Sequence, residues 1–317
     1  IMPQDAFTIY HASLELNETL KGARVEKINQ PEKDAVTLSI RTADKRNATL
    51  LISANANGAR VCVTSSNKPA PLQAPAFCML LRKHLARATV QKVEAVPFER
   101  ITIITFDCKD ELGTPSEKQA IVEIMGKYSN ITLVENGIIL GAMKTTDFDF
   151  NLTRPIFPGA KYVYPLPQDK INADEPEKIR ATYSSFDGEL ESFIFNKLKG
   201  VSKPTADEIA FRFFKENNIT RNVKTFKIDD FISFYQNFYE NAKIKPNVVF
   251  DENYSDFFIL DYATVGKNKT YFKDINSAID YYFSKKEANA AFTAKKRKLT
   301  DSSFLIAILE QSTNAPD

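Results

Sequence analysis

The sequence contains few of the side chains that form disulfides or bind metals. Its 317 residues include three cysteines and two histidines, His11 and His84. Cys62, Cys78 and Cys108 are widely spaced and form no Cys-x-x-Cys pair, which argues against a disulfide framework and against a structural zinc site. Cys78 and His84 lie six residues apart in one expected helix and point in different directions, so a catalytic thiol–imidazole pair is disfavoured. We expect reduced thiols, no metal and no cofactor.

Long apolar runs and a strong net charge are also missing. No run of about 18 apolar residues is present, so we expect no membrane span. The first sixteen residues are amphipathic and carry an acid early, which does not fit a signal peptide. The net charge is +2, so any nucleic-acid surface must be a local patch. These features predict a cytoplasmic protein that does not bind membranes.

Residues 35–142 have the pattern of β-strands. Residues 35–42 alternate apolar and polar side chains, the period of a half-buried strand. The other β-branched segments are 48–54, 59–64, 99–107, 119–125 and 130–140. The dipeptides Asn57-Gly58 and Asn136-Gly137 are typical of hairpin turns. Helices are expected near 6–20 and 77–85, so the fold class of this part is α+β.

The remaining sequence is mostly helical after a proline-rich segment. Residues 153–178 contain five prolines, which predict an extended strap that ends in a linker. Segments with helical spacing of apolar residues are 184–200, 205–218, 228–242 and 277–299, and residues 250–274 indicate a small β element. Thr205 is expected to cap a helix, with Glu208 three residues on. We predict an α+β domain over 1–172, a mainly helical domain over 173–284 and the start of a coiled coil over 285–317.

Several cations are candidates for contacts with phosphate. The helix at 77–85 places Phe77, Leu80, Leu81, His84 and Leu85 on one face, which we interpret as the core face. Arg82 and Lys83 lie on the other face, and Arg87 flanks it; they fit either a phosphate contact or a solvated surface. Lys295, Lys296 and Arg297 fit either ribosomal RNA or a solvated helix face. The glycine turn at 198–202 is either a phosphate contact or an ordinary helical hairpin.

Several blocks together resemble a known family. They are PAFCMLLRKHL (75–85), ERITIITF (99–106), VEIMGKYSNITLVENGIILGAMK (122–144) and RPIFPGAKY (154–162). In this order they resemble the NFACT-N module of the ribosome quality-control proteins called RqcH in bacteria, formerly described as fibronectin-binding protein A (FbpA). Residues 5–31 and 50–64 fit the same pattern, so the resemblance extends from about residue 5 to residue 167. LKGVSKPTADEIAFRF resembles the helix-hairpin-helix module that follows, and KKRKLT resembles the start of the family's coiled-coil arm, here truncated.

The resemblance implies a tRNA-recruiting factor rather than an enzyme. Such proteins bind a stalled large ribosomal subunit that carries peptidyl-tRNA, and they recruit aminoacyl-tRNA, alanyl-tRNA in bacteria, for alanine tailing of the nascent chain. The ribosome forms the bond, so no catalytic residue is expected here. The implied fold is similar to the N-terminal domain of formamidopyrimidine-type DNA glycosylases.

Two motifs that the family uses for tRNA match this sequence. The family's Asp-Arg pair corresponds to Glu99-Arg100, where glutamate keeps the charge but reaches one methylene further. The family's Glu-Ile-Met motif corresponds to Glu123, Ile124 and Met125. Glu123 is interpreted as an acceptor for a base edge, Met125 as a contact to a sugar and the adjacent Lys127 as a phosphate contact. A surface ion pair at 99–100 and a plain strand end at 123–125 are the alternatives.

Two rival functions are less consistent with the sequence. Met2-Pro3-Gln4 superficially resembles the start of a DNA glycosylase, which uses an N-terminal proline followed by glutamate, but Gln4 lacks the acid and a four-cysteine zinc finger is missing. A fibronectin- or fibrinogen-binding adhesin, the second rival, is not supported by an export signal or by disulfides.

Overall fold

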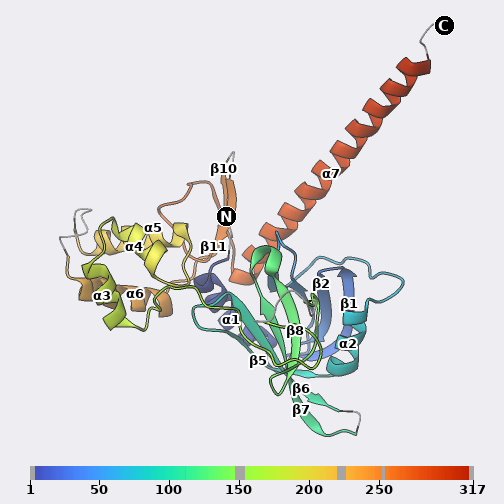
Figure 1. Ribbon diagram of the computed structural model, residues 1–317, viewed down its shortest axis with the longest axis horizontal. Helices are drawn as coiled ribbons and strands as arrows, with labels where there is room; N and C mark the ends of the chain where they lie inside the picture. The colour runs from blue at the N-terminus through green and yellow to red at the C-terminus, as the bar shows by residue number, and fades with distance from the viewer. Residues whose placement is uncertain (1–3, 111, 147–153, 220–225, 252–253, 314–317) are drawn as a thin grey trace.

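The computed structural model describes residues 4–110, 112–146, 154–219, 226–251 and 254–313. A curved sheet with two helices forms one part, a group of short helices lies beside it, and a small second sheet lies near the junction (Figure 1). A single long helix projects away from both. The α+β fold class is therefore confirmed. The similarity to DNA glycosylases remains a prediction, and Met2 and Pro3, on which part of that comparison rests, lie outside the described residues.

The large sheet has nine antiparallel strands in the order β4-β3-β2-β1-β5-β6-β7-β8-β9. Their bounds are β1 Arg24–Glu32, β2 Ala35–Arg41, β3 Asn47–Ser53, β4 Arg60–Val63, β5 Thr89–Ala95, β6 Ile101–Lys109, β7 Pro115–Glu123, β8 Asn130–Glu135 and β9 Ile138–Ala142. The hairpin turn at Asn136-Gly137 has positive φ at both residues, as the dipeptide predicts. The strands from β6 to β9 are covered on a second face by Ile156 and Ala160 of the strap, which explains the nearly continuous apolar run in β6.

The two central strands, β1 and β5, are not evident from the alternation of the sequence. The pairing of β1 with β2 shifts register between Val25 and Lys27 and again between Asn29 and Glu32, and β5 has a similar shift after Val90. Each shift inserts an unpaired residue, so apolar side chains no longer fall at every second position. The sheet is therefore continuous through the region where the sequence shows the weakest strand pattern.

Two helices cover the inner face of the large sheet. They are α1 Ala6–Leu20, which packs on β5 and β6, and α2 Ala76–Leu85, which packs on β1, β6 and β9. The predicted core face of α2 is partly wrong. Its buried residues are Phe77, Cys78, Leu81 and Leu85, whereas Leu80 and His84, which were expected in the core, are half-buried. All three cysteines are free and buried. Burial raises the pKa of the Cys62 thiol to about 12, which is consistent with an unreactive thiol.

The second part of the chain contains four short helices and a three-stranded sheet. Their bounds are α3 Pro176–Ser184, α4 Leu190–Lys197, α5 Lys203–Glu216, α6 Ile228–Glu240, β10 Asn247–Asp251, β11 Tyr254–Phe258 and β12 Lys269–Tyr271. The predicted cap is wrong by one turn: α5 begins at Lys203, and the side chain of Ser202 accepts from the Thr205 amide. Glu208 does not complete a capping box, because its carboxylate is buried and accepts from Arg212 and Thr264. The α4–α5 pair is a helical hairpin, and its assignment as a helix-hairpin-helix module remains a prediction.

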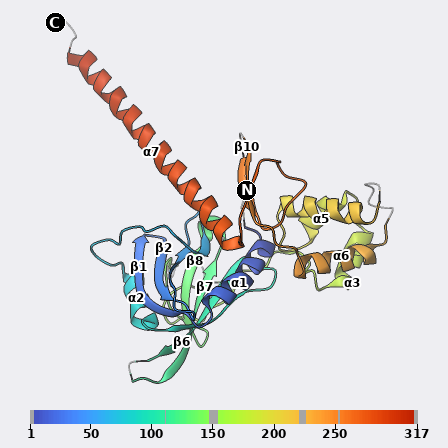
Figure 2. The ribbon, with the colours of Figure 1, turned by 180° about the vertical axis from the view of Figure 1, so that it is seen from behind.

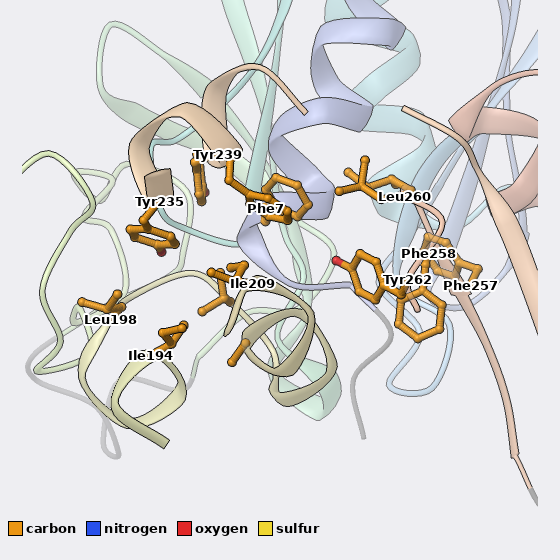
Figure 3. Packing of buried hydrophobic residues seen from close by; sticks show 14 of the residues in the cluster. Phe7, Ile194, Leu198, Ile209, Tyr235, Tyr239, Phe257, Phe258, Leu260 and Tyr262 are labelled. Atoms are coloured by element: carbon orange, nitrogen blue, oxygen red, sulfur yellow. The ribbon is translucent and has the colours of Figure 1, made fainter. Parts of the chain in front are cut away.

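A shared core joins the two parts across the predicted boundary at residue 172. Phe7 of α1 lies beside Tyr239 of α6, with ring centroids 5.4 Å apart (Figure 3). Phe7 belongs to one buried cluster with Ile209 of α5 and Tyr262 of the small sheet's loop. The burial of these large side chains ties the N-terminus of α1 to the helical part, while a second buried cluster between the large sheet, α1 and α2 forms a core of its own.

His11 is buried at this junction, and we expect it to make the junction sensitive to pH. Its Nε2 donates to the carbonyl oxygen of Tyr239 at 2.8 Å, and burial lowers the pKa of the imidazole below 6.5, although the Tyr239 carbonyl and Asp5 act in the opposite direction. Because the unfolded chain binds this proton more readily, the stability that neutral His11 provides is complete above about pH 6.5 and is lost as the pH falls towards the folded-state pKa.

We predict that wild-type protein loses more stability between pH 7.5 and 5.5 than the His11→Gln variant, with a difference of at most about 1.4 kcal/mol per pH unit. Glutamine retains a donor but does not titrate, and it leaves His84 in place as a common background. Urea unfolding at both pH values measures the effect. An equal loss in both proteins would contradict the role of His11.

The projecting helix is α7, Ile275–Thr313, and its first three turns are anchored. Glu15 of α1 accepts from the amides of Ile275 and Asn276 at 2.8 and 2.7 Å, so one helix caps another. The Asn276 side chain pairs with both backbone groups of Val63 on the edge strand β4. Farther along, exposed Phe292, Leu299 and Ile306 recur at seven-residue spacing, which fits the predicted coiled coil. Within the described residues, α7 and the other helices are not long and apolar enough to span a bilayer.

Candidate nucleic-acid interface

A cleft of about 950 Å³ lies where the two parts of the chain meet. One wall is the turn before β6 together with Met125, and the opposite wall is the turn between α4 and α5. The strap and the loop after Tyr262 complete it. The lining residues are Gln4–Ala6, Phe98–Arg100, Met125, Pro165, Leu166, Gln168, Lys170, Phe195, Lys199–Pro204, Asp207 and Thr264–Gly266. The cleft therefore brings Glu99, Arg100 and Met125, from both sequence motifs, to one place.

The turn before β6 holds Glu99 and Arg100 at the cleft. Phe98 has a left-handed backbone, with φ of 58°, which is rare for a side chain of this size. Its ring packs 5.2 Å from Tyr239, so contact with the helical part supports the strained turn. The carbonyl of Arg100 accepts from the Ile124 amide at 2.9 Å, which connects the two motifs directly. The backbone positions of both motifs are thus fixed together.

The charges of Glu99 and Arg100 lie among other charged groups. The Glu99 carboxylate pairs with Lys199 on the opposite wall. Burial lowers the pKa of the Arg100 guanidinium, while Asp5 and Glu99 favour its charged form. The lining contains four cations (Arg100, Lys170, Lys199 and Lys203) and three carboxylates (Asp5, Glu99 and Asp207), so its positive charge is largely balanced from within. Apolar side chains such as Phe98, Met125 and Phe195 supply surface on which a planar base can stack.

The interpretation of Glu123 as an acceptor for a base edge is wrong for this structure. Its side chain is 1% exposed and forms a bidentate ion pair with Arg154, one bond of which is 2.9 Å, and it accepts from the Tyr162 hydroxyl at 2.9 Å. Burial and the Glu123 carboxylate raise the pKa of Tyr162, which keeps that hydroxyl a donor. Glu123 is a positioning residue: it clamps the strap, which supplies Leu166 to the cleft, against the strand end that supplies Met125.

Ile124 and Met125 have different surroundings. Ile124 is buried in the core beneath the sheet, so it supports the motif without facing a ligand. The Met125 amide donates to the Ser129 side chain at 2.8 Å, and its side chain, half-buried, lines the cleft. Met125 is therefore the member of the Glu-Ile-Met motif that is placed to touch a ligand.

Asp5 occupies part of the glycine turn that we considered as a phosphate contact. One carboxylate oxygen caps α1 by accepting from the Thr8 amide at 2.8 Å. The other accepts from the Ser202 amide at 2.9 Å and from the Thr205 hydroxyl at 2.7 Å, at the start of α5. The Lys199 amide donates to the carbonyl of Ile171. At least two amides of the turn are therefore satisfied by the chain itself.

The structure does not bring the other candidate cations to the cleft. Arg82 donates to the Ile28 carbonyl at 2.8 Å and to Asn29, so it links α2 to β1. Lys83 is exposed on α2, and Arg87 is exposed in the turn after this helix. The helix α2 and α5 lie at opposite ends of the molecule, with the large sheet between them (Figure 2). Lys127 is exposed and lies over the Tyr128 ring at 4.9 Å, on the turn that follows Met125. Lys295, Lys296 and Arg297 are exposed on α7. Their RNA contacts remain predictions.

Sequence reasoning missed three residues of this site. Asp5 and Lys199 were within recognised blocks but carried no role, and Arg154 was noted only as part of the strap block. Each acts on a residue far along the chain: Arg154 on Glu123, Lys199 on Glu99 and Asp5 on Ser202. Such pairs leave no local signal in a single sequence.

Comparison with known proteins gives consistent matches. Residues 5–315 match the family described as NFACT N-terminal and middle domains. The Rqc2 homolog RqcH of Bacillus subtilis is 31% identical over 293 residues, 90% of this chain and 50% of that protein. RqcH of Streptococcus suis is 29% identical over 289 residues, 90% of this chain and 49% of that protein. The chain thus spans about half the length of these curated relatives.

A solved structure has the same fold. The N-terminal part of the fibronectin/fibrinogen-binding protein from Streptococcus suis superposes with a TM-score of 0.74 at 29% identity, covering 89% of this chain and 99% of that one. The comparison shows that the fold of this chain is shared with a solved protein, and the predicted domain boundaries stay predictions.

Proposed function

The chain belongs to the NFACT family, as the sequence blocks indicated, and from this premise we propose that it recruits tRNA to stalled large ribosomal subunits. In this proposal the protein binds a subunit that carries peptidyl-tRNA and delivers aminoacyl-tRNA, alanyl-tRNA if the chain comes from a bacterium, for tailing of the nascent chain. It acts in the cytoplasm on the ribosome. The ribosome forms the peptide bonds, so the protein is not an enzyme and needs neither cofactor nor metal.

One observation carries the proposal for this part of the chain: both tRNA-related motifs of the family meet at a single cleft. Arg100 and Met125 line it, and Glu123 holds two of its walls in place. The cleft combines a guanidinium with apolar and aromatic surface, the combination that binds unpaired nucleotides through phosphate contacts and base stacking. The exposed cations of α7 and α2 are separate surfaces that we assign to ribosomal RNA contacts.

The direct test is the affinity of the chain for tRNA. We expect Arg100→Ala to weaken binding by about 1–3 kcal/mol, because a charge-assisted contact is lost. Arg46→Ala is the matched control: it removes the same charge from a side chain that is 74% exposed and outside the cleft. Fluorescence anisotropy with purified tRNA measures both. Equal affinities of the folded variants would remove Arg100 from the interface.

A binding protein for fibronectin or fibrinogen is the second candidate, favoured by the description of the structural neighbour. The salt dependence of binding separates the two functions. For tRNA, a plot of the logarithm of the association constant against the logarithm of the salt concentration has a slope of about −0.7 to −0.9 for each phosphate contact. Gln4 does not support the glycosylase alternative, because it is buried and donates to the Ala59 carbonyl at 2.7 Å, which is a structural role.

A further inference from the structure

The ion pair between Glu99 and Lys199 joins the two walls of the cleft. Glu99 belongs to the turn before β6, and Lys199 to the turn between α4 and α5. The side chain of Lys199 is 10% exposed and that of Glu99 is 24% exposed. Lys203 pairs with Asp207 on its own helix, whereas Lys170 of the strap donates to the backbone carbonyl of Phe195 in α4 and forms no ion pair with it. The pair at Lys199 is thus a contact across the site rather than within a wall.

We propose that Glu99 is a specificity-determining residue that restrains the affinity of the cleft for anions by occupying Lys199. The Glu99 carboxylate takes the place on Lys199 that a ligand phosphate would take. A polyanion must then displace this carboxylate to gain the contact, and a ligand that engages Arg100 or the apolar wall at the same time is favoured over one that offers charge alone. This inference rests on the proposed function, since it assigns a role within the same cleft.

Two physical features make Lys199 responsive to this competition. A largely buried ammonium gains more from an ionic partner than an exposed one, because it has already lost much of its hydration. It therefore needs either Glu99 or a ligand phosphate. The reach of the side chain also matters: aspartate, which the resemblance assigns to this position in the family, is shorter by one methylene and would not span the same gap without movement of a wall.

The test compares Glu99→Gln, Lys199→Gln and the double variant with wild-type protein, using purified tRNA over a range of salt. Release of Lys199 in Glu99→Gln adds one phosphate contact, so we expect affinity to rise about five- to eightfold at 0.1 M salt, with a salt slope steeper by about 0.7–0.9. Glu94→Gln is the matched control, since it removes the same charge from β5 outside the cleft. Glu99→Asp, which keeps the charge, should show a smaller gain.

The double variant shows whether Glu99 acts through Lys199. We expect no gain from Glu99→Gln when Lys199 is already glutamine, whereas independent residues would give the same gain in both backgrounds. If folded Glu99→Gln binds tRNA no more tightly than wild-type protein while Arg100→Ala still binds it more weakly, this inference is overturned and the proposed function stays intact. Absence of tRNA binding by every variant would overturn both.

Discussion

Replacing Arg154 by alanine is expected to lower the free energy of unfolding by about 3–5 kcal/mol, because the substitution leaves a buried carboxylate without its partner. Glu123 is 1% exposed, and two bonds from Arg154 and one from Tyr162 satisfy it. After the substitution Tyr162 alone would remain. The same change frees the strap from the strand end, so the cleft loses the fixed position of its Leu166 wall. Urea unfolding measures the effect.

Two controls separate this pair from an ordinary surface contact. Arg24→Ala removes an exposed arginine whose bond to Glu26 is 3.4 Å long, and we expect a change of about 0–1 kcal/mol. The double variant Glu123→Leu/Arg154→Met replaces both charges by apolar groups and should be more stable than Arg154→Ala. A loss in Arg154→Ala no larger than in Arg24→Ala would contradict the role of Glu123 as a buried anchor.

The second large effect is expected at Asp5. Asp5→Ala removes the cap of α1, worth about 1 kcal/mol, and two charge-assisted bonds to α5, each worth about 1.5–3 kcal/mol. Since the three contacts share one carboxylate and are not additive, we expect a loss of about 3 kcal/mol in the free energy of unfolding. The loss should be accompanied by weaker tRNA binding, because Asp5 joins α1 to the cleft wall at Ser202.

Asp274→Ala is the matched control for Asp5. Asp274 accepts from the Ser277 amide at 2.7 Å at the start of α7, so it caps a single helix. We expect a loss of about 1 kcal/mol. Asp5→Asn retains one oxygen acceptor and should lie between wild type and Asp5→Ala. Similar losses in Asp5→Ala and Asp274→Ala would show that Asp5 acts as a simple cap.

The sequence predicted those elements whose pattern is local. The strands from β2 to β4 and from β6 to β9 alternate or are densely apolar, and the helix at Ala6–Leu20 was located to the residue. β1 and β5 were missed because bulges interrupt the period of two, and Pro31 within β1 also argues against a strand. The prediction of Thr205 as the cap is wrong because Ser202, Thr205 and Glu208 form a plausible local pattern, whereas Ser202 caps α5 and the Thr205 hydroxyl donates to the distant Asp5.

The candidate site was only partly predictable. The motif resemblance predicts that Arg100 and Met125 contact a ligand; both line the cleft, and the ligand contact itself stays a prediction. It could not show that Glu123 is buried, since the partner Arg154 lies 31 residues away. It also could not show that Glu99 is paired across the cleft, since Lys199 lies 100 residues along the chain. Geometry of this kind arises only when the strap and the helices fold back on the sheet.

The most direct measurement of the central claim is sequencing of the RNA that co-purifies with the chain at low salt, beside the Arg100→Ala variant prepared in the same way. If the cleft binds tRNA, one tRNA family should be enriched with the wild-type chain, and the enrichment should be lost in the variant. A mixture of RNAs that is the same in both preparations would contradict the assignment of the tRNA site to this cleft.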